Sequence, residues 1–129
     1  MNTGRAAQTR RKVENIMKKK LTIKTRVTIH TAGDLDGYGF SRGIELLMLG
    51  IDRYGSLNRA AKEMGMAYSK AWNVLRMVEQ EFDIQLVRRD GAHGSSLTDE
   101  GRAFLEHYQE MVAAANEAAS AVFQRYFAK

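Results

Sequence analysis

Side chains able to recognise a nucleic acid lie close together in the segment YSKAWNVLR, residues 68–76. Ser69, Lys70 and Asn73 share one face at helical spacing, and Tyr68 lies beside them. An asparagine amide can pair with adenine through two hydrogen bonds, and a lysine ammonium can donate to guanine. Because the segment contains no acidic residue, we expect its exposed face to enter a DNA major groove, with Lys70 and Asn73 as the base readers.

Hydroxyl and cationic side chains before and after this segment can contact backbone phosphates. Ser56 begins a helical pattern and can offer its hydroxyl and nearby amides to a phosphate. For Lys70 and Arg76 the alternative is an ordinary solvated helix charge. Trp72 shares a face with apolar positions and is expected to pack at the core rather than stack on a base. The expected DNA-contacting residues are Ser56, Arg59, Tyr68, Ser69, Lys70, Asn73, Arg76, Arg88, Arg89 and His93.

Three helices are predicted from the spacing of apolar residues around this segment. The first runs from Ser41 to Gly55, a residue suited to a helix C-terminus. The second is about two turns long, is capped by Ser56 and stops at Gly65. The third begins at residues 67–68. A short alanine-packed helix, a glycine turn and a longer helix with a polar start are typical of a helix-turn-helix.

A two-stranded wing is predicted directly after the third helix. Ile84–Arg89 reads as a strand, Asp90–Ser96 as a glycine-containing loop, and Leu97 as the start of a second short strand. Thr98 can then cap a long helix whose first turn is acidic, as the helix dipole favours. Its apolar stripe continues almost to the C-terminus. Because one small winged domain cannot cover such a stripe, we expect it to contact a second copy of the chain.

The N-terminal part of the predicted domain is expected to add a β-hairpin. Leu21–Thr31 alternates apolar and polar residues, which predicts a half-buried strand, and Tyr38–Phe40 can form the return strand. The expected fold is therefore mainly α with a small β component. It is a winged helix-turn-helix with an N-terminal strand or hairpin and a long C-terminal dimerisation helix. We expect a basic arm at 1–20, the DNA-binding domain at 21–97 and the dimerisation helix at 98–129.

The charge of the chain is concentrated at its N-terminus. Residues 1–20 hold seven Lys and Arg residues against one Glu, a net +6, whereas the whole chain carries +5, so the rest sums to about −1. Such an arm can contact nucleic acid or can be a solvated tail, and the sequence leaves both open. The chain has no cysteine, no signal peptide pattern and no apolar run of membrane-spanning length. We expect a soluble, cytoplasmic protein without membrane contact.

The chain resembles the DNA-binding domain of ModE-type regulators, within the LysR-type winged helix-turn-helix group. The resemblance extends from about residue 21 to the C-terminus and is strongest in GSLNRAAKEMGMAYSKAW and LVRRDGAHGSSLTDEGRAFL. It implies a winged helix-turn-helix fold and regulation of transcription through DNA. The positions that carry it are Tyr68, Ala71 and Trp72, then Leu86, Val87 and Arg89, and finally Leu97, Thr98 and Gly101.

Three departures from the ModE-type pattern qualify what the resemblance implies. Lys70 sits one position later than the lysine of the family, so the preferred DNA sequence is expected to differ. The loop DGAHGSS is shorter and poorer in glycine and lysine, and Arg88 stands where an acidic residue is common. Molybdate-sensing members carry a C-terminal oxyanion-binding region. Because this chain ends after its last predicted helix, we expect it to lack that region.

The sequence therefore predicts a sequence-specific regulator that binds double-stranded DNA as a homodimer. No catalytic constellation is visible, so we expect no enzymatic activity and no cofactor. Ser95 and Ser96 lie beside His93 in a loop, which does not build an oriented triad. A metal site is not expected, because the other histidines are distant in sequence. The alternative function is a winged protein-interaction or architectural module, and molybdate is suggested as an effector by the resemblance only.

Overall fold

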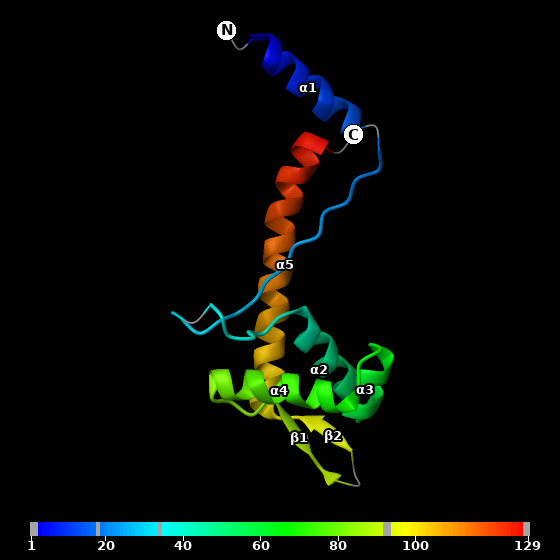
Figure 1. Cartoon of the computed structure of the whole chain (residues 1–129), viewed down its shortest axis with the longest axis vertical. Helices are drawn as coiled ribbons and strands as arrows, with labels where there is room; N and C mark the ends of the chain where they lie inside the picture. The colour runs from blue at the N-terminus through cyan, green and yellow to red at the C-terminus, as the bar shows by residue number, and fades with distance from the viewer. Residues whose placement is uncertain (1–2, 18, 34, 92–93, 128–129) are drawn as a thin grey trace. The chain divides into compact units, whose positions relative to one another are not determined.

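The computed structural model describes residues 3–17, 19–33, 35–91 and 94–127. The chain divides into two compact units, one of residues 26–112 and one of residues 1–25 with 113–129. None of the described helices is both long and apolar enough to cross a membrane. In chain order the elements are α1 (Thr3–Met17), α2 (Arg42–Tyr54), α3 (Leu57–Glu63), α4 (Tyr68–Phe82), β1 (Val87–Arg89), β2 (Ser95–Leu97) and α5 (Asp99–Phe127) (Figure 1).

The core of the larger unit lies between α2, α3, α4 and the first turns of α5. Each helix buries residues at the three- and four-residue spacing read from the sequence. Phe40 joins this core through tilted ring contacts with Phe104 at 4.7 Å and Tyr108 at 4.9 Å between centroids. The buried helical residues are Ile44, Leu47, Met48 and Ile51 in α2, Leu57, Ala60 and Ala61 in α3, and Ala71, Val74, Leu75 and Val78 in α4.

Helices α2 and α3 meet at an unusually close distance, which explains the small residues there. A Cβ atom added at Gly50 would lie 2.6 Å from Cβ of Ala60. Between the helices, Gly55 adopts φ +66° and its amide donates to the Ile51 carbonyl at 2.7 Å. Ser56 then caps α3, because its Oγ accepts the Arg59 amide at 3.1 Å. The predicted end of α2 at Gly55 and the predicted cap of α3 are confirmed, whereas α3 ends at Glu63, two residues before the predicted Gly65.

The turn between α3 and α4 gives the helix-turn-helix its sharp change of direction. Gly65 adopts φ +64°, a left-handed conformation that a side chain would oppose, and the Met66 amide donates back to the Ala61 carbonyl at 2.9 Å. Helix α4 begins at Tyr68, as predicted. Its N-cap residue, Ala67, makes no side-chain hydrogen bond to the first turn.

The wing is an antiparallel pair in which Val87 faces Leu97, Arg88 faces Ser96 and Arg89 faces Ser95. Two contacts outside the sheet hold it in place. The Glu79 carboxylate of α4 accepts the amides of Leu86 and Val87 at 2.7 and 3.2 Å. The Ser95 amide donates to the carbonyl of Gly55 at 2.9 Å. At Gly94, φ is +90° and an added Cβ would lie 2.2 Å from that same Gly55 oxygen.

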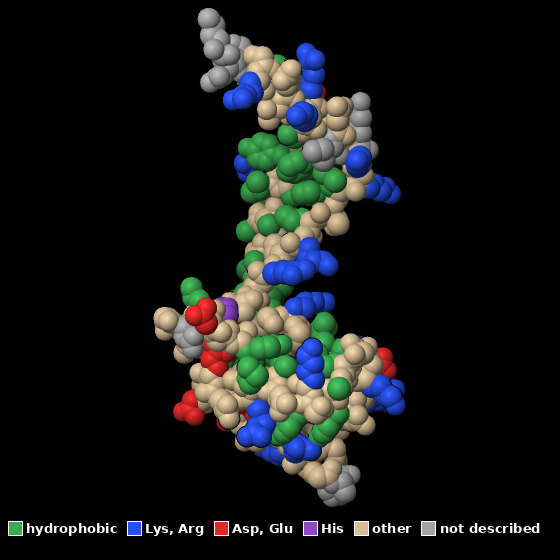
Figure 2. Space-filling model, viewed as in Figure 1, with side chains coloured by type: hydrophobic (Ala, Val, Ile, Leu, Met, Phe, Trp, Pro, Cys, Tyr) green, Lys and Arg blue, Asp and Glu red, His purple; other side chains and the backbone are tan. Residues whose placement is uncertain are grey.

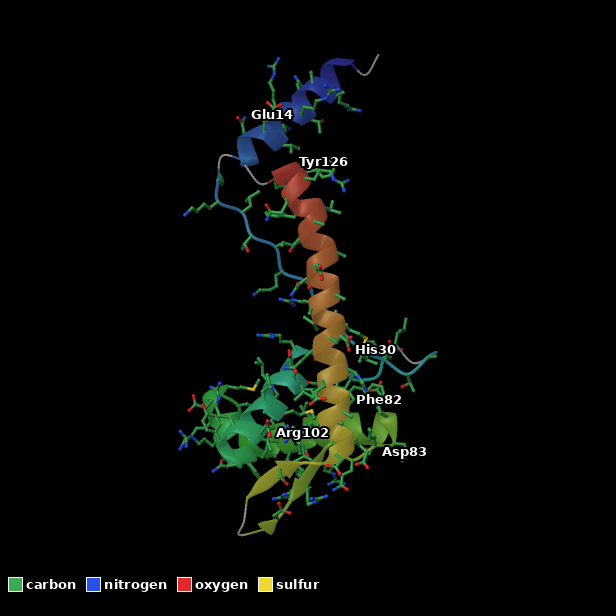
Figure 3. The ribbon with its side chains drawn as sticks, turned by 180° about the vertical axis from the view of Figure 1, so that it is seen from behind. Glu14, His30, Phe82, Asp83, Arg102 and Tyr126 are labelled. Carbon is green, nitrogen blue, oxygen red and sulfur yellow. The ribbon has the colours of Figure 1, made fainter. Side chains whose placement is uncertain are left out.

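Helix α5 starts against the base of the wing. The Gly101 amide donates to Thr98 Oγ1 at 2.9 Å, which confirms Thr98 as the cap. Further along, Arg102, which is labelled in Figure 3, forms an ion pair with Asp52 of α2 at 2.7 Å. The hydrogen bond from Arg102 lowers the pKa of the Asp52 carboxyl. The mainly helical winged helix-turn-helix with a long C-terminal helix is confirmed.

Two predicted strands differ from the structure. Leu21–Thr31 is not a strand, and the N-terminal hairpin is reduced to one bridge, in which Ile29 and Phe40 exchange backbone hydrogen bonds of 2.9 Å. The segment also bonds to side chains of α5, since Tyr108 Oη donates to the Val27 carbonyl at 2.8 Å and Thr25 donates to Asn116. No neighbouring strand is present to complete a ladder with it, among the residues that the structure describes.

Both wing strands also differ from the prediction. The second strand ends at Leu97, where it was expected to begin, because Ser95 and Ser96 pair with Arg89 and Arg88. The first strand is shorter than predicted. It begins at Val87 rather than Ile84, because the backbone before it bonds to the end of α4. The Ile84 amide donates to the Glu79 carbonyl at 3.1 Å, and the Leu86 amide donates to the Glu79 side chain. At the N-terminus, α1 forms a helix within the stretch for which the sequence predicted only a basic arm.

Candidate nucleic-acid interface

The outer face of α4 carries the polar residues that the sequence singled out. Tyr68, Ser69, Lys70, Asn73 and Arg76 are all exposed. The opposite face is buried, so the helix cannot rotate to hide them without giving up its core packing. Ser69 and Asn73 lie one turn apart, and Lys70 and Arg76 flank Asn73 at three-residue spacing. The face therefore presents a hydroxyl, an amide and two cations side by side.

Besides the Glu79 contact at its base, the wing contacts the start of α4 through Arg89. The Arg89 guanidinium lies over the Trp72 ring at 4.5 Å and near the Tyr68 ring at 5.6 Å from the centroids. It also donates a hydrogen bond to the Tyr68 hydroxyl. Trp72 itself is partly buried and packs against the core, as predicted. Its ring is the surface on which the Arg89 guanidinium lies.

A groove runs between the start of α3, the start of α4 and the wing. Its walls bring together Ser56, Tyr68 and Arg89, all three singled out from the sequence. They also include Asn58 and Ser95, which the sequence analysis missed. Ser95 approaches α3 only because Gly94 packs against Gly55, and no spacing in the sequence announces that contact. The groove offers hydroxyl, amide and guanidinium groups to one ligand.

The remaining predicted contacts are dispersed around this groove. Arg59 is exposed, with its guanidinium over the Tyr54 ring at 4.2 Å, so that it is stacked at the α2 end of the surface. Arg88 is exposed on β1. His93 lies outside the described residues. Figure 2 shows Lys and Arg side chains over the region of α4 and the hairpin. Within the described part of the chain, no three His, Cys, Asp or Glu residues gather as a metal site would require.

Comparison with known proteins finds a family similar to this part of the chain. Residues 47–102 match the family described as bacterial regulatory helix-turn-helix protein, lysR family. The matched range spans the helix-turn-helix and the wing. The matched range contains all ten expected DNA-contacting residues, whereas α1 and most of α5 lie outside it. No curated protein sequence matches the chain significantly.

Solved structures share the winged helix-turn-helix fold of this part of the chain. The DNA-binding domain of CbnR in complex with DNA has a TM-score of 0.51 and 20% identity over 60% of this chain and 88% of that one. The DNA-binding domain of BenM with benA site 1 DNA gives 0.51 and 19% over 62% and 89%. VV2_1132, a LysR family transcriptional regulator, gives 0.51 and 17% over 63% of this chain and 28% of its own.

Proposed function

We propose that the protein is a sequence-specific transcriptional regulator that binds double-stranded DNA through α4. One observation carries the proposal: Ser69, Lys70 and Asn73 stand exposed together on the second helix of a LysR-family helix-turn-helix. In this motif the second helix lies in the major groove with its first turns against the base edges. Asn73 then reads adenine and Lys70 reads guanine, while Ser69 and Tyr68 add hydroxyl contacts.

Phosphate contacts position the helix in this proposal. A backbone phosphate seated in the groove between α3, α4 and the wing lies within reach of Ser56 and Tyr68. The solved domains of CbnR and BenM, which share this fold, were determined in complex with DNA, and this supports DNA as the partner here. The remaining phosphate contacts in the proposal are Arg59, Arg76, Arg88 and His93, whereas the Arg89 guanidinium already contacts side chains of α4.

A homodimer formed through α5 is the second part of the proposal. The C-terminal half of α5 exposes apolar side chains, which water solvates poorly. Among them, Val122 is 49% exposed and Tyr126 is 53% exposed. Figure 2 shows hydrophobic side chains along this half of α5. A second copy supplies a self-complementary surface for such a stripe. Two copies would place two α4 helices about 34 Å apart and favour an inverted-repeat site.

Likeness to ModE-type regulators is the finer level of the proposal. It rests on Tyr68, Ala71 and Trp72 of α4, where the structure adds that the two aromatic rings share one arginine. Molybdate is a candidate effector only because of this resemblance. The match covers 28% of the length of VV2_1132. Any regulation by the other segments of VV2_1132 is a property of that protein.

Selection of bound duplexes from a random pool at about 150 mM salt tests the function. We expect enrichment of an inverted repeat, with sedimentation of the protein as a dimer at micromolar concentration. Binding without enrichment would indicate an architectural protein. No binding would indicate a protein-interaction module, the alternative that fits the near-neutral charge outside the arm. Enrichment of a single half-site by a monomer would remove the dimer from the proposal.

The basic helix α1 is expected to contribute affinity without specificity. Its described side chains from Gly4 to Asn15 are exposed except for Val13, so Arg10, Arg11 and Lys12 face water. Their replacement by glutamine should weaken binding to every duplex and make the slope of log K against log salt shallower, by about 0.9 for each phosphate that the helix no longer neutralises. Titrations at several salt concentrations measure the slope. With Gln8→Ala as the control, an unchanged slope would leave α1 without a role in DNA binding.

A further inference from the structure

Arg89 differs from Arg88, the other described cation of the wing strands, because its guanidinium already contacts side chains of α4. Its guanidinium lies over Trp72 and donates to the Tyr68 hydroxyl, both on α4. A guanidinium stacked on an indole ring keeps its in-plane N–H donors available for a hydrogen bond. Arg88, one residue earlier, is also exposed on β1, but its side chain has no ring or hydrogen-bond partner among the described residues.

The hydrogen bond from Arg89 fixes what the Tyr68 hydroxyl can do. A phenol has one hydrogen to donate and lone pairs to accept. Because Arg89 supplies the donor on one side, the oxygen acts as acceptor there, and its own hydrogen is left to donate to a ligand. Tyr68 is 37% exposed and borders the groove beside α3. The acceptors that such a donor meets on DNA are phosphate oxygens, N7 and O6 of guanine, and O4 of thymine.

The structure therefore points to Arg89 as a positioning residue for DNA recognition rather than a phosphate contact. This inference rests on the proposed function. Arg89 couples the wing to the start of α4, sets the orientation of Trp72 and Tyr68, and holds the Tyr68 hydroxyl as a hydrogen-bond donor. Because this role assigns no phosphate to Arg89, its removal is expected to loosen the alignment of the base-reading helix without lowering the number of phosphates that the protein neutralises.

The experiment compares Arg89→Ala and Arg89→Lys with Arg88→Ala in the full chain. For each protein, affinity is titrated on the selected duplex and on a scrambled duplex at several salt concentrations. Arg89→Ala is expected to reduce discrimination between the duplexes by about tenfold with an unchanged salt slope. Arg88→Ala should show the reverse, a slope reduced by about 0.9 and unchanged discrimination. Arg89→Lys should restore little, since an ammonium lacks the planar fork.

Two further measurements separate positioning from a general structural role. Tyr68→Phe should lose as much discrimination as Arg89→Ala, and combining the two should add little, because both remove one interaction. The chain has a single tryptophan, so Trp72 emission reports the contact without DNA. Emission should shift in Arg89→Ala and stay constant in Arg88→Ala, with the melting temperature of each variant measured as a folding control.

The outcomes distinguish this inference from the function on which it rests. If the parent protein fails to discriminate between duplexes, the proposed function fails and the inference falls with it. If the parent discriminates and Arg89→Ala lowers the salt slope as Arg88→Ala does, Arg89 is a phosphate contact and the inference alone is overturned. Unchanged Trp72 emission in Arg89→Ala would overturn it as well.

Discussion

Replacing both Lys70 and Asn73 with alanine is expected to reduce affinity for the selected duplex by between about 30-fold and 10⁴-fold. Each bidentate pair of a side chain with a base is worth about 1–3 kcal/mol of discrimination, and the variant loses two. Both side chains are exposed on α4, so their removal leaves the core intact. Affinity for a scrambled duplex should change by much less, because phosphate contacts supply it. Parallel titrations on the two duplexes measure both effects.

The matched control for this variant is Lys62→Ala, which removes an exposed lysine from α3 instead of α4. It should leave discrimination between the selected and scrambled duplexes within about twofold, since a single surface charge positions but does not specify. Equal losses on the two duplexes in the double variant would contradict base reading by α4. Lys70 and Asn73 would then be solvated or phosphate-contacting residues, as the sequence left open for Lys70.

Gly101→Ala is expected to lower the free energy of unfolding by about 1–3 kcal/mol, although alanine is the better helix former. A Cβ atom at this position would lie 2.1 Å from the Leu86 carbonyl oxygen and 2.8 Å from its carbon. Both atoms belong to the backbone just before β1, so no side chain can rotate away. The wing must move from α5, which also strains the Thr98 cap. Equilibrium denaturation by urea measures the loss.

Gly43→Ala provides the control within another helix. It lies in the first turn of α2, and nothing in the structure falls within 4 Å of an added Cβ. Because the alanine loses less chain entropy on folding, this variant should be more stable than the parent by about 0.4–1 kcal/mol. If Gly101→Ala were as stable as Gly43→Ala, the close packing of α5 on the wing would not exist in solution.

The sequence predicted the helix-turn-helix and the wing well because their signals are local. Ser56 predicts a helix cap, and Gly55 and Gly65 predict turns. The spacing of apolar residues in α4 distinguishes its buried face from its exposed face. The residues placed on that exposed face are indeed exposed there. Their roles toward DNA remain predictions, since exposure alone does not distinguish a base contact from a solvated charge.

The parts that the sequence missed depend on contacts between distant residues. Alternation in Leu21–Thr31 predicted that one side of an extended segment packs against the protein. It could not predict that the packing partner is a helix, α5, rather than a neighbouring strand. Arg89 lies 21 residues from Tyr68, so its engagement with two rings is invisible in the sequence. The i, i+4 spacing of Tyr68 and Trp72 was the available signal, since it places both rings on one face.

The contact between Gly94 and Gly55 gives the wing a mechanical property. A hairpin of three residue pairs is barely stable alone and would bend at its base. Here the Ser95 amide, near the far end, is tied to the carbonyl at the end of α2, while Glu79 holds the near end at Leu86 and Val87. A load on the hairpin is therefore carried by α2 and α4 and the core between them. Because the strand pair is anchored near both of its ends, we expect it to move with the core rather than to bend independently of it.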